Sequence, residues 1–285
     1  MICPHQIQVK NKHPTPSHPD SYIEVPCGKC VICQRNKQRE WVFRIQCEET
    51  QSKSSLFITL TYDDKYLPYD NCKPTLSKRH CQLFFKQLRK KFKDSNLRYY
   101  LVGEYGSHTH RPHYHLILFN LPFKNVKDAQ KIIEKFWKRG FVYVGSVTHG
   151  SIAYCAKYSI KIDTGHDSEF PVREFMLCSR RPALGSCYLD RYGDRHLKDV
   201  DRSVTYSRYP HGIPRLFKNK LNLRALEEGN FAYLYARYKE TKLIKSLPQI
   251  EYEFRQEHPN EPYNPYRDEQ HLIAEIRKRQ EREKF

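Results

Sequence analysis

The sequence contains no apolar run of about eighteen residues, and its N-terminus lacks the charged-then-apolar pattern of a secretory signal. The first absence argues against a membrane-spanning helix, and the second argues against export. No repeat occurs at the periods of solenoids or propellers. We therefore expect a cytoplasmic protein with no membrane partner.

Acidic residues are scarce relative to basic ones. The chain has 50 Lys and Arg against 32 Asp and Glu, which gives a formal charge of +18 and a pI of about 9.4. Such an excess most often serves contact with a polyanion, commonly nucleic acid. A generally basic surface is the alternative, but basic residues cluster at 86–93 and 277–284. The 285 residues suffice for one large domain or two modest ones.

Ten unevenly spaced cysteines in a chain without an export signal favour metal binding or burial over a disulfide framework. Three of them form a C-x-x-C-x-x-C motif: Cys27, Cys30 and Cys33. A tight turn would let these thiolates converge on one ion, so we predict a structural Zn²⁺ site. Cys3 is the expected fourth ligand, with His5 and Cys47 as alternatives. The opposing interpretation is a set of free thiols near a helix start.

Strand and helix patterns alternate through the middle of the chain. Apolar alternation predicts strands over 56–64, 97–106, 112–120 and 140–147, and helical periodicity predicts helices over 34–50, 76–92, 126–139 and 151–161. This order favours an α+β fold, with a central antiparallel sheet and flanking helices. After residue 163 the pattern becomes loop-like, and helices return over 221–245 and 267–284.

The motif His113-Tyr114-His115 places two imidazoles on one face of a predicted strand, because side chains alternate along a strand. Glu104 lies in the preceding strand, where a hairpin could bring it beside His113. Two imidazoles and one carboxylate leave coordination positions free for water and a phosphate oxygen, as a Lewis-acid site requires. The alternatives are histidines without metal and a salt bridge from Glu104 to Arg111.

Tyr154 and Tyr158 lie four residues apart, one turn along the same face of a predicted helix. Lys157 and Lys161 repeat that step, and their ammonium groups would favour phenolate and steady a phosphate. A phenol with a pKa of about 10 needs such help to attack at neutral pH. Ordinary core packing is the alternative. Together with the metal motif, the tyrosines suggest a nuclease that bonds tyrosine to phosphate.

Basic residues in two places are candidates for contact with DNA phosphates. They lie on one face of the predicted helix over 76–92 and in the SRRP loop: Lys86, Arg89, Lys90, Arg180 and Arg181. Each alone is typical of a solvated surface charge, so the prediction depends on their collective excess.

Five segments carry a resemblance to a known family: VPCGKCVICQRN, FITLTYDD, VGEYG, RPHYHLILFN and YCAKYSIK. The chain resembles the HUH endonuclease superfamily and, within it, the replication initiation proteins of microviruses in the gokushovirus branch. The resemblance spans roughly residues 1–220, with the four core motifs in family order. The middle residue of the histidine motif is Tyr114 rather than an aliphatic residue, and it should point away from the metal.

The resemblance implies rolling-circle initiation, in which the origin is nicked and rejoined through a 5′-phosphotyrosine intermediate. It implies Mg²⁺ or Mn²⁺ on Glu104, His113 and His115. It also implies two alternating nucleophiles, Tyr154 and Tyr158, with Lys157 and Lys161 orienting the phosphate. The expected partners are single-stranded origin DNA, host helicase and polymerase, in the cytoplasm of a host bacterial cell. Family folds have a central antiparallel sheet with an RNA-recognition-motif-like arrangement.

We therefore expect four segments: a Cys-rich segment with a helix (1–50), the HUH endonuclease core (51–165), a basic loop-rich segment (166–220) and a helical C-terminal extension (221–285). Two other functions remain open. One is a plasmid relaxase or single-strand transposase that uses the same metal chemistry. The other is a non-catalytic, zinc-containing DNA-binding regulator.

Overall fold

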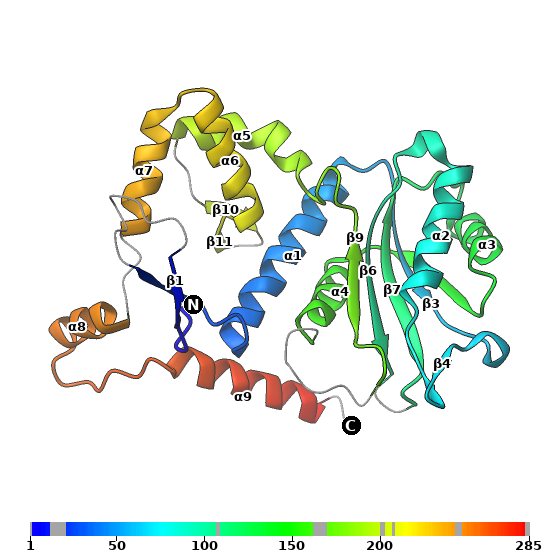
Figure 1. The fold of residues 1–285 in the computed structure, drawn as a ribbon, viewed down its shortest axis with the longest axis horizontal. Coiled ribbons are helices and arrows are strands. Elements are labelled where there is room, and N and C mark those ends of the chain that lie inside the picture. Colours follow the sequence, from blue (N-terminus) through cyan, green and yellow to red (C-terminus); the bar gives the residue numbers. More distant parts are fainter. Residues whose placement is uncertain are drawn as a thin grey trace. The chain divides into compact units, whose positions relative to one another are not determined.

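The computed structural model describes residues 2–11, 21–106, 109–161, 170–199, 203–206, 209–242 and 247–282 (Figure 1). The chain divides into two compact units, Gln38–Arg191 and the pair of segments Met1–Lys37 and Tyr192–Phe285. The four segments expected from the sequence stay a prediction, and the compact units divide the chain at other positions.

The unit Gln38–Arg191 is built on a five-stranded antiparallel sheet with the order β8-β3-β7-β6-β9. Its strands are β3 (Ser55–Leu60), β6 (Arg98–Tyr105), β7 (Pro112–Phe119), β8 (Val142–Ser146) and β9 (Phe175–Cys178). The predicted α+β class with a central antiparallel sheet is confirmed. The prediction of loops after residue 163 was wrong at β9, because four apolar residues are too few to show strand alternation.

Helices cover both faces of this sheet (Figure 1). They are α1 (Val31–Gln51), α2 (Lys78–Lys91), α3 (Val126–Trp137) and α4 (His149–Lys161). The Ser77 side chain accepts a hydrogen bond from the backbone N–H of His80, which confirms the predicted cap of α2. Asn125 caps α3 in the same way, through the N–H of Asp128. The shorter elements of this unit are β4 (Tyr69–Asp70), β5 (Lys73–Pro74) and two 3-10 turns, Asp64–Tyr66 and Lys93–Ser95.

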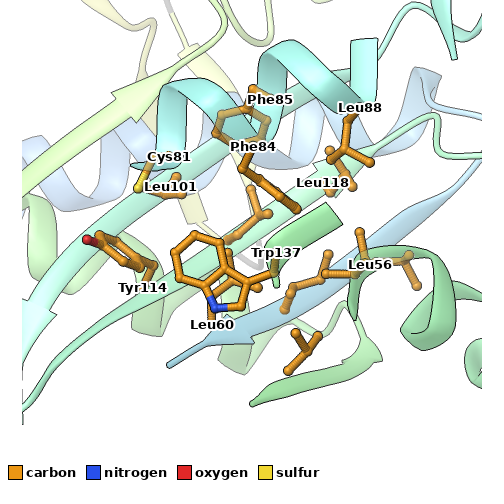
Figure 2. Packing of buried hydrophobic residues seen from close by; sticks show 14 of the residues in the cluster. Leu56, Leu60, Cys81, Phe84, Phe85, Leu88, Leu101, Tyr114, Leu118 and Trp137 are labelled. Atoms are coloured by element: carbon orange, nitrogen blue, oxygen red, sulfur yellow. The ribbon is translucent and has the colours of Figure 1, made fainter. Parts of the chain in front are cut away.

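The main hydrophobic core lies between one face of the sheet and helices α2 and α3 (Figure 2). Phe84 of α2 and Trp137 of α3 pack edge to face, with ring centroids 5.9 Å apart, and both are fully buried. They meet Leu60 and Leu118 from the strands. Each such side chain contributes roughly 1.5–3 kcal/mol through burial, so this face supplies much of the stability of the unit.

Tyr114 points into that core and carries a buried polar network. Its hydroxyl accepts a hydrogen bond from the Ser77 backbone N–H at 2.8 Å and lies 2.9 Å from the Tyr62 hydroxyl. The Tyr62 hydroxyl in turn lies 2.8 Å from His80 Nδ1. The network therefore ties the start of α2 to strand β7, and Tyr114 faces away from its two histidine neighbours, as expected.

The opposite face of the sheet packs against α1 and α4. The rings of Trp41 and Tyr100 lie 5.1 Å apart. Glu48 of α1 forms a buried ion pair with Arg98 of β6, with Oε1 2.5 Å from Nε. Glu48 Oε2 also accepts a hydrogen bond from the Gly185 N–H at 2.7 Å. This face is thus held by a charged contact as well as by apolar packing.

The second unit contains an antiparallel hairpin, β1 (Ile7–Lys10) with β2 (Tyr22–Val25), the first turns of α1 and a set of C-terminal elements. These elements are α5 (Cys187–Asp199), which begins in the other unit, β10 (Ser203–Tyr206), β11 (Tyr209–Gly212), α6 (Arg215–Glu227), α7 (Phe231–Lys242), α8 (Leu247–Glu257) and α9 (Arg267–Arg282).

Two expectations for this region were wrong and one holds. Residues 187–199 form a helix rather than a loop. The helix predicted over 221–245 is divided between α6 and α7, because Gly229 takes the left-handed conformation (φ 66°). The predicted terminal helix is confirmed as α9. Among the helices of the described ranges, none combines the length and the apolar character that crossing a membrane requires.

Candidate metal centre and tyrosine site

The register of β6 and β7 brings the carboxylate and the imidazoles together. Glu104 and His113 are direct partners across the antiparallel pair, and His115 lies opposite Val102. Residues two apart on a strand share a face, so all three side chains project to the side covered by α1 and α4. The expected hairpin contact between Glu104 and the histidine motif is therefore confirmed.

The three side chains converge closely. Glu104 Oε1 lies 2.7 Å from His113 Nε2 and 2.8 Å from His115 Nε2. Arg111 pairs with Asp64 instead of Glu104, at 2.6 Å. Burial alone would raise the pKa of Glu104, but the hydrogen bonds from His113 and His115 outweigh it and lower the pKa. The salt bridge with Arg111, considered as the alternative for Glu104, does not form.

These residues fit a divalent cation. One ligand atom from each lies within 4.8 Å of the others. His113 Nδ1 lies 3.0 Å from the Arg111 carbonyl oxygen, which leaves Nε2 facing the centre. Glu104 Oε2 is buried and has no hydrogen-bond partner among the described residues. A buried carboxylate oxygen without a partner is costly, and a metal ion would satisfy it.

Strand β3 supplies two further contacts to His115. Thr59 Oγ1 lies 3.1 Å from His115 Nδ1, and the Phe57 ring stacks on the imidazole with centroids 5.8 Å apart and an interplanar angle of 10°. Neither residue was predicted from the sequence. The signal was a threonine at a position whose strand neighbours, Ile58 and Leu60, are both apolar core residues.

Helix α4 places Tyr154 beside the cluster. Its hydroxyl donates a hydrogen bond to Glu104 Oε1 at 3.3 Å and lies 3.5 Å from His115 Nε2. The side chain is 39% exposed, so a substrate could reach the hydroxyl. Cys155 is buried beneath the helix, and Gln38 of α1 donates a hydrogen bond to the Ala153 carbonyl at 3.1 Å. These contacts fix the turn that carries Tyr154.

The other residues predicted on this helix are less fully described. Lys157 is exposed. Tyr158 and Lys161 belong to α4, and their side chains lie outside the described part of the structure. The sequence spacing still places Tyr158 one helical turn beyond Tyr154.

The predicted DNA-contacting residues lie away from the metal cluster. Lys86, Arg89 and Lys90 are exposed on α2, which packs on the sheet face opposite Glu104. Arg180 and Arg181 are exposed just after β9. Arg89, Arg180 and Arg181 line one open cavity of about 680 Å³, together with Tyr99. No Asp or Glu is among the described residues that line it.

The cysteine motif and Cys3 also converge, in the unit that contains the N-terminal hairpin. The four Sγ atoms lie within 4.8 Å of one another. The rivals for the fourth position lie elsewhere: His5 Nε2 is 2.8 Å from Glu269, and Cys47 is buried in the other unit. Burial would raise the pKa of the Cys27 thiol, but hydrogen bonds from the backbone N–H groups of Cys30 and Lys29 lower it below the usual value.

Comparison with known proteins adds to this geometry. A family model for the replication-associated protein ORF2 matches residues 55–163. Replication-associated protein ORF2 of Spiroplasma virus 4 is 37% identical over 157 residues, covering 48% of this chain and 48% of that protein. Replication-associated protein VP4 of Bdellovibrio phage phiMH2K is 30% identical over 217 residues, covering 68% of this chain and 66% of that protein. The chain thus spans less than two thirds of either relative's length.

A solved structure shows a more distant likeness. The N-terminal nuclease domain of minute virus of mice non-structural protein 1 matches with 9% identity and a TM-score of 0.21, over 53% of this chain and 81% of that chain. A TM-score this low carries no argument. The matched segment 55–163 contains the Glu104 cluster and Tyr154, and together with the two relatives it shows that the chain belongs to the ORF2 family of phage replication-associated proteins.

Proposed function

We propose that this protein is an HUH-type rolling-circle replication initiator that nicks and rejoins single-stranded DNA at the viral origin through a 5′-phosphotyrosine intermediate. One observation carries the proposal. The Tyr154 hydroxyl lies 3.3 Å from Glu104 Oε1, the same oxygen that contacts both histidines. A potential nucleophile and a potential metal centre therefore share one site.

Glu104, His113 and His115 would hold the ion, and Mg²⁺ or Mn²⁺ fits the role. Bound there, the ion would supply Lewis-acid polarisation of the scissile phosphate. The neighbouring residues hold the ligands in place. The Arg111 carbonyl orients His113, while Thr59 and Phe57 orient His115.

Tyr154 performs the covalent step. Its phenolic oxygen attacks the phosphorus, a Tyr–O–P bond forms, and the bond from phosphorus to the 3′ oxygen breaks. The phenolic proton passes to solvent, and the departing 3′ oxygen takes up a proton to become the free hydroxyl. Because one phosphate ester replaces another, attack by a 3′-hydroxyl on the phosphotyrosine reverses the reaction without ATP.

The remaining residues of α4 have supporting roles in this proposal. Tyr158 is the second nucleophile, one turn from Tyr154, and would cut the regenerated origin while Tyr154 still holds a 5′ end. The ammonium groups of Lys157 and Lys161 orient the phosphate and favour phenolate. Lys157 is exposed beside Tyr154 on the helix, as this role requires.

DNA contact extends beyond the site. Arg89, Arg180 and Arg181 share the cavity between α2 and the end of β9 and would bind backbone phosphates of the origin strand. Lys86 and Lys90 extend the same basic helix face. Host helicase and polymerase complete the proposed partners, in the cytoplasm of the host bacterial cell.

The test uses the full chain, Mn²⁺ and a pool of overlapping single-stranded oligonucleotides that tile the genome encoding it. A 5′-phosphotyrosine links the protein to the downstream fragment, so a 3′ label should migrate with the protein on a denaturing gel. A 5′ label should appear on a shorter, free fragment. EDTA should abolish both products.

Matched tyrosine variants identify the nucleophile. Tyr154→Phe together with Tyr158→Phe should remove the adduct. Tyr143→Phe should keep it, because Tyr143 is exposed on β8 and outside the cluster. No adduct with any oligonucleotide would overturn the proposal and support a DNA-binding regulator. An adduct without release of a unit-length single-stranded circle from a replicating template would instead support a relaxase or transposase.

A further inference from the structure

Four cysteine sulfurs meet at the base of the N-terminal hairpin. Cys3 precedes β1, whereas Cys27, Cys30 and Cys33 lie between β2 and the first turn of α1. Pairing of β1 with β2 sets Ile7 opposite Val25, which brings the chain before β1 next to the turn after β2. Residues far apart in the sequence are thereby delivered to one point.

The spacing of the sulfurs matches a tetrahedral metal site. Cys3 Sγ lies 3.6 Å from Cys27 Sγ and 3.7 Å from Cys30 Sγ, and the Sγ atoms of Cys27 and Cys33 lie 4.0 Å apart. Zinc binds thiolates at about 2.3 Å, which sets the edge of a tetrahedron of sulfurs at about 3.8 Å. The three separations fall on both sides of that value.

The backbone around the sulfurs favours negative charge. The N–H groups of Lys29 and Cys30 donate to Cys27 Sγ at 3.4 and 3.3 Å. The N–H of Cys27 donates to Cys3 Sγ at 3.4 Å. Gly28 takes the left-handed conformation (φ 74°), which lets the turn fold around the sulfur. Such donors stabilise thiolates, the form that a metal ion binds.

We infer that Cys3, Cys27, Cys30 and Cys33 bind one Zn²⁺ in an all-thiolate tetrahedral site that fixes the start of α1. This inference is independent of the proposed nuclease activity. Four protein ligands leave no open position, so the ion is structural rather than catalytic. On binding, the ion replaces the thiol protons, which pass to solvent.

The position of the site gives it a specific structural effect. Helix α1 is 21 residues long; it begins at the cysteine cluster, and its later residues Trp41 and Glu48 hold the sheet of the other unit. Loss of zinc should therefore loosen the hairpin and the first turns of α1. The Glu104 cluster, held by β6 and β7, should retain its contacts.

Metal content tests the inference directly. The protein purified from zinc-supplemented medium should contain one zinc per chain by elemental analysis and by native mass spectrometry. Replacement with Co²⁺ should give the absorption bands of a tetrahedral thiolate complex. Cys3→Ser should lose zinc on dialysis against a chelator, whereas Cys3→His should keep it, because imidazole also binds zinc. Cys72→Ser should behave as wild type, since Cys72 is exposed and outside the cluster.

Amide hydrogen exchange supplies a second measurement that does not depend on nicking. Exchange over residues 27–37 should be faster in the zinc-depleted protein, with exchange in β6 and β7 unchanged. A wild-type protein without zinc, a protein that holds iron instead, or full zinc retention by Cys3→Ser would overturn the inference. Full zinc with no DNA adduct would contradict the proposed function alone.

Discussion

Glu104 and His113 are opposed residues of the antiparallel pair β6–β7, and the carboxylate oxygen Oε1 lies 2.7 Å from the imidazole Nε2. The backbone hydrogen bonds of two central strands hold this contact in place. The candidate metal centre is therefore preformed by sheet register, and it needs no loop movement to assemble.

Replacement of Glu104 by Gln should separate metal binding from folding. The amide keeps the size of the side chain but removes the charge that binds the cation. We expect the rate of adduct formation with Mn²⁺ to fall by about 100-fold or more, as measured on the labelled oligonucleotide. Glu134→Gln, at an exposed site on α3, should leave the rate unchanged. A wild-type rate in Glu104→Gln would show that the carboxylate does not bind a catalytic ion.

Thr59 should act as a positioning residue for His115. Its hydroxyl lies 3.1 Å from His115 Nδ1, so Thr59→Val should leave the imidazole less well oriented. We expect the Mn²⁺ concentration for half-maximal adduct formation to rise about tenfold, with the rate at saturating Mn²⁺ close to wild type. Thr61→Val is the matched control, because its hydroxyl bonds to the Phe141 carbonyl instead. Equal Mn²⁺ requirements in both variants would argue against this role.

The sequence predicted the parts of the site that lie close together along the chain. Strand alternation placed His113 and His115 on one face, and the short hairpin made Glu104 their neighbour. The contributions of Phe57 and Thr59 could not be predicted, because they depend on the register between β3 and β7, whose paired residues are about sixty positions apart. Nothing in either strand alone specifies that register.

The basic cavity shows a second limit. Arg89 and Arg180 were predicted as separate phosphate contacts, and they come together because β9 pairs with β6. The sequence of β9, FMLC, gives no alternation. Without that strand, the loop that follows it had no predicted position in the fold. The cavity therefore emerged only from the three-dimensional structure.

Neutralising the cavity should weaken DNA binding in a salt-dependent way. The double variant Arg180→Gln, Arg181→Gln removes two candidate phosphate contacts. The slope of log K against log salt for single-stranded DNA should then decrease in magnitude by about 1.4, at roughly 0.7 for each contact. Lys127→Gln with Lys131→Gln, exposed on α3, removes the same charge elsewhere and should change the slope less. Identical slopes for the two double variants would argue for a general charge effect.

Tyr114→Phe should affect stability rather than chemistry. The change removes the hydroxyl that accepts from the Ser77 N–H and contacts the Tyr62 hydroxyl. Leaving those buried groups without a partner should cost about 1–3 kcal/mol of unfolding free energy, measured by urea denaturation. Tyr69→Phe, at an exposed residue, should be neutral. An unchanged urea midpoint for Tyr114→Phe would show that water replaces the lost contacts.

The pleat of β7 sends His113 and His115 toward the ion-binding face and Tyr114 into the oily layer beneath α2. A saturation scan along this strand should therefore give phenotypes that alternate from one residue to the next. Every second position would yield folded protein that fails to cut, and the positions between would yield less folded protein that still cuts normally per molecule. Homologous sequences should then tolerate polar exchange at neither set, but for two unrelated reasons.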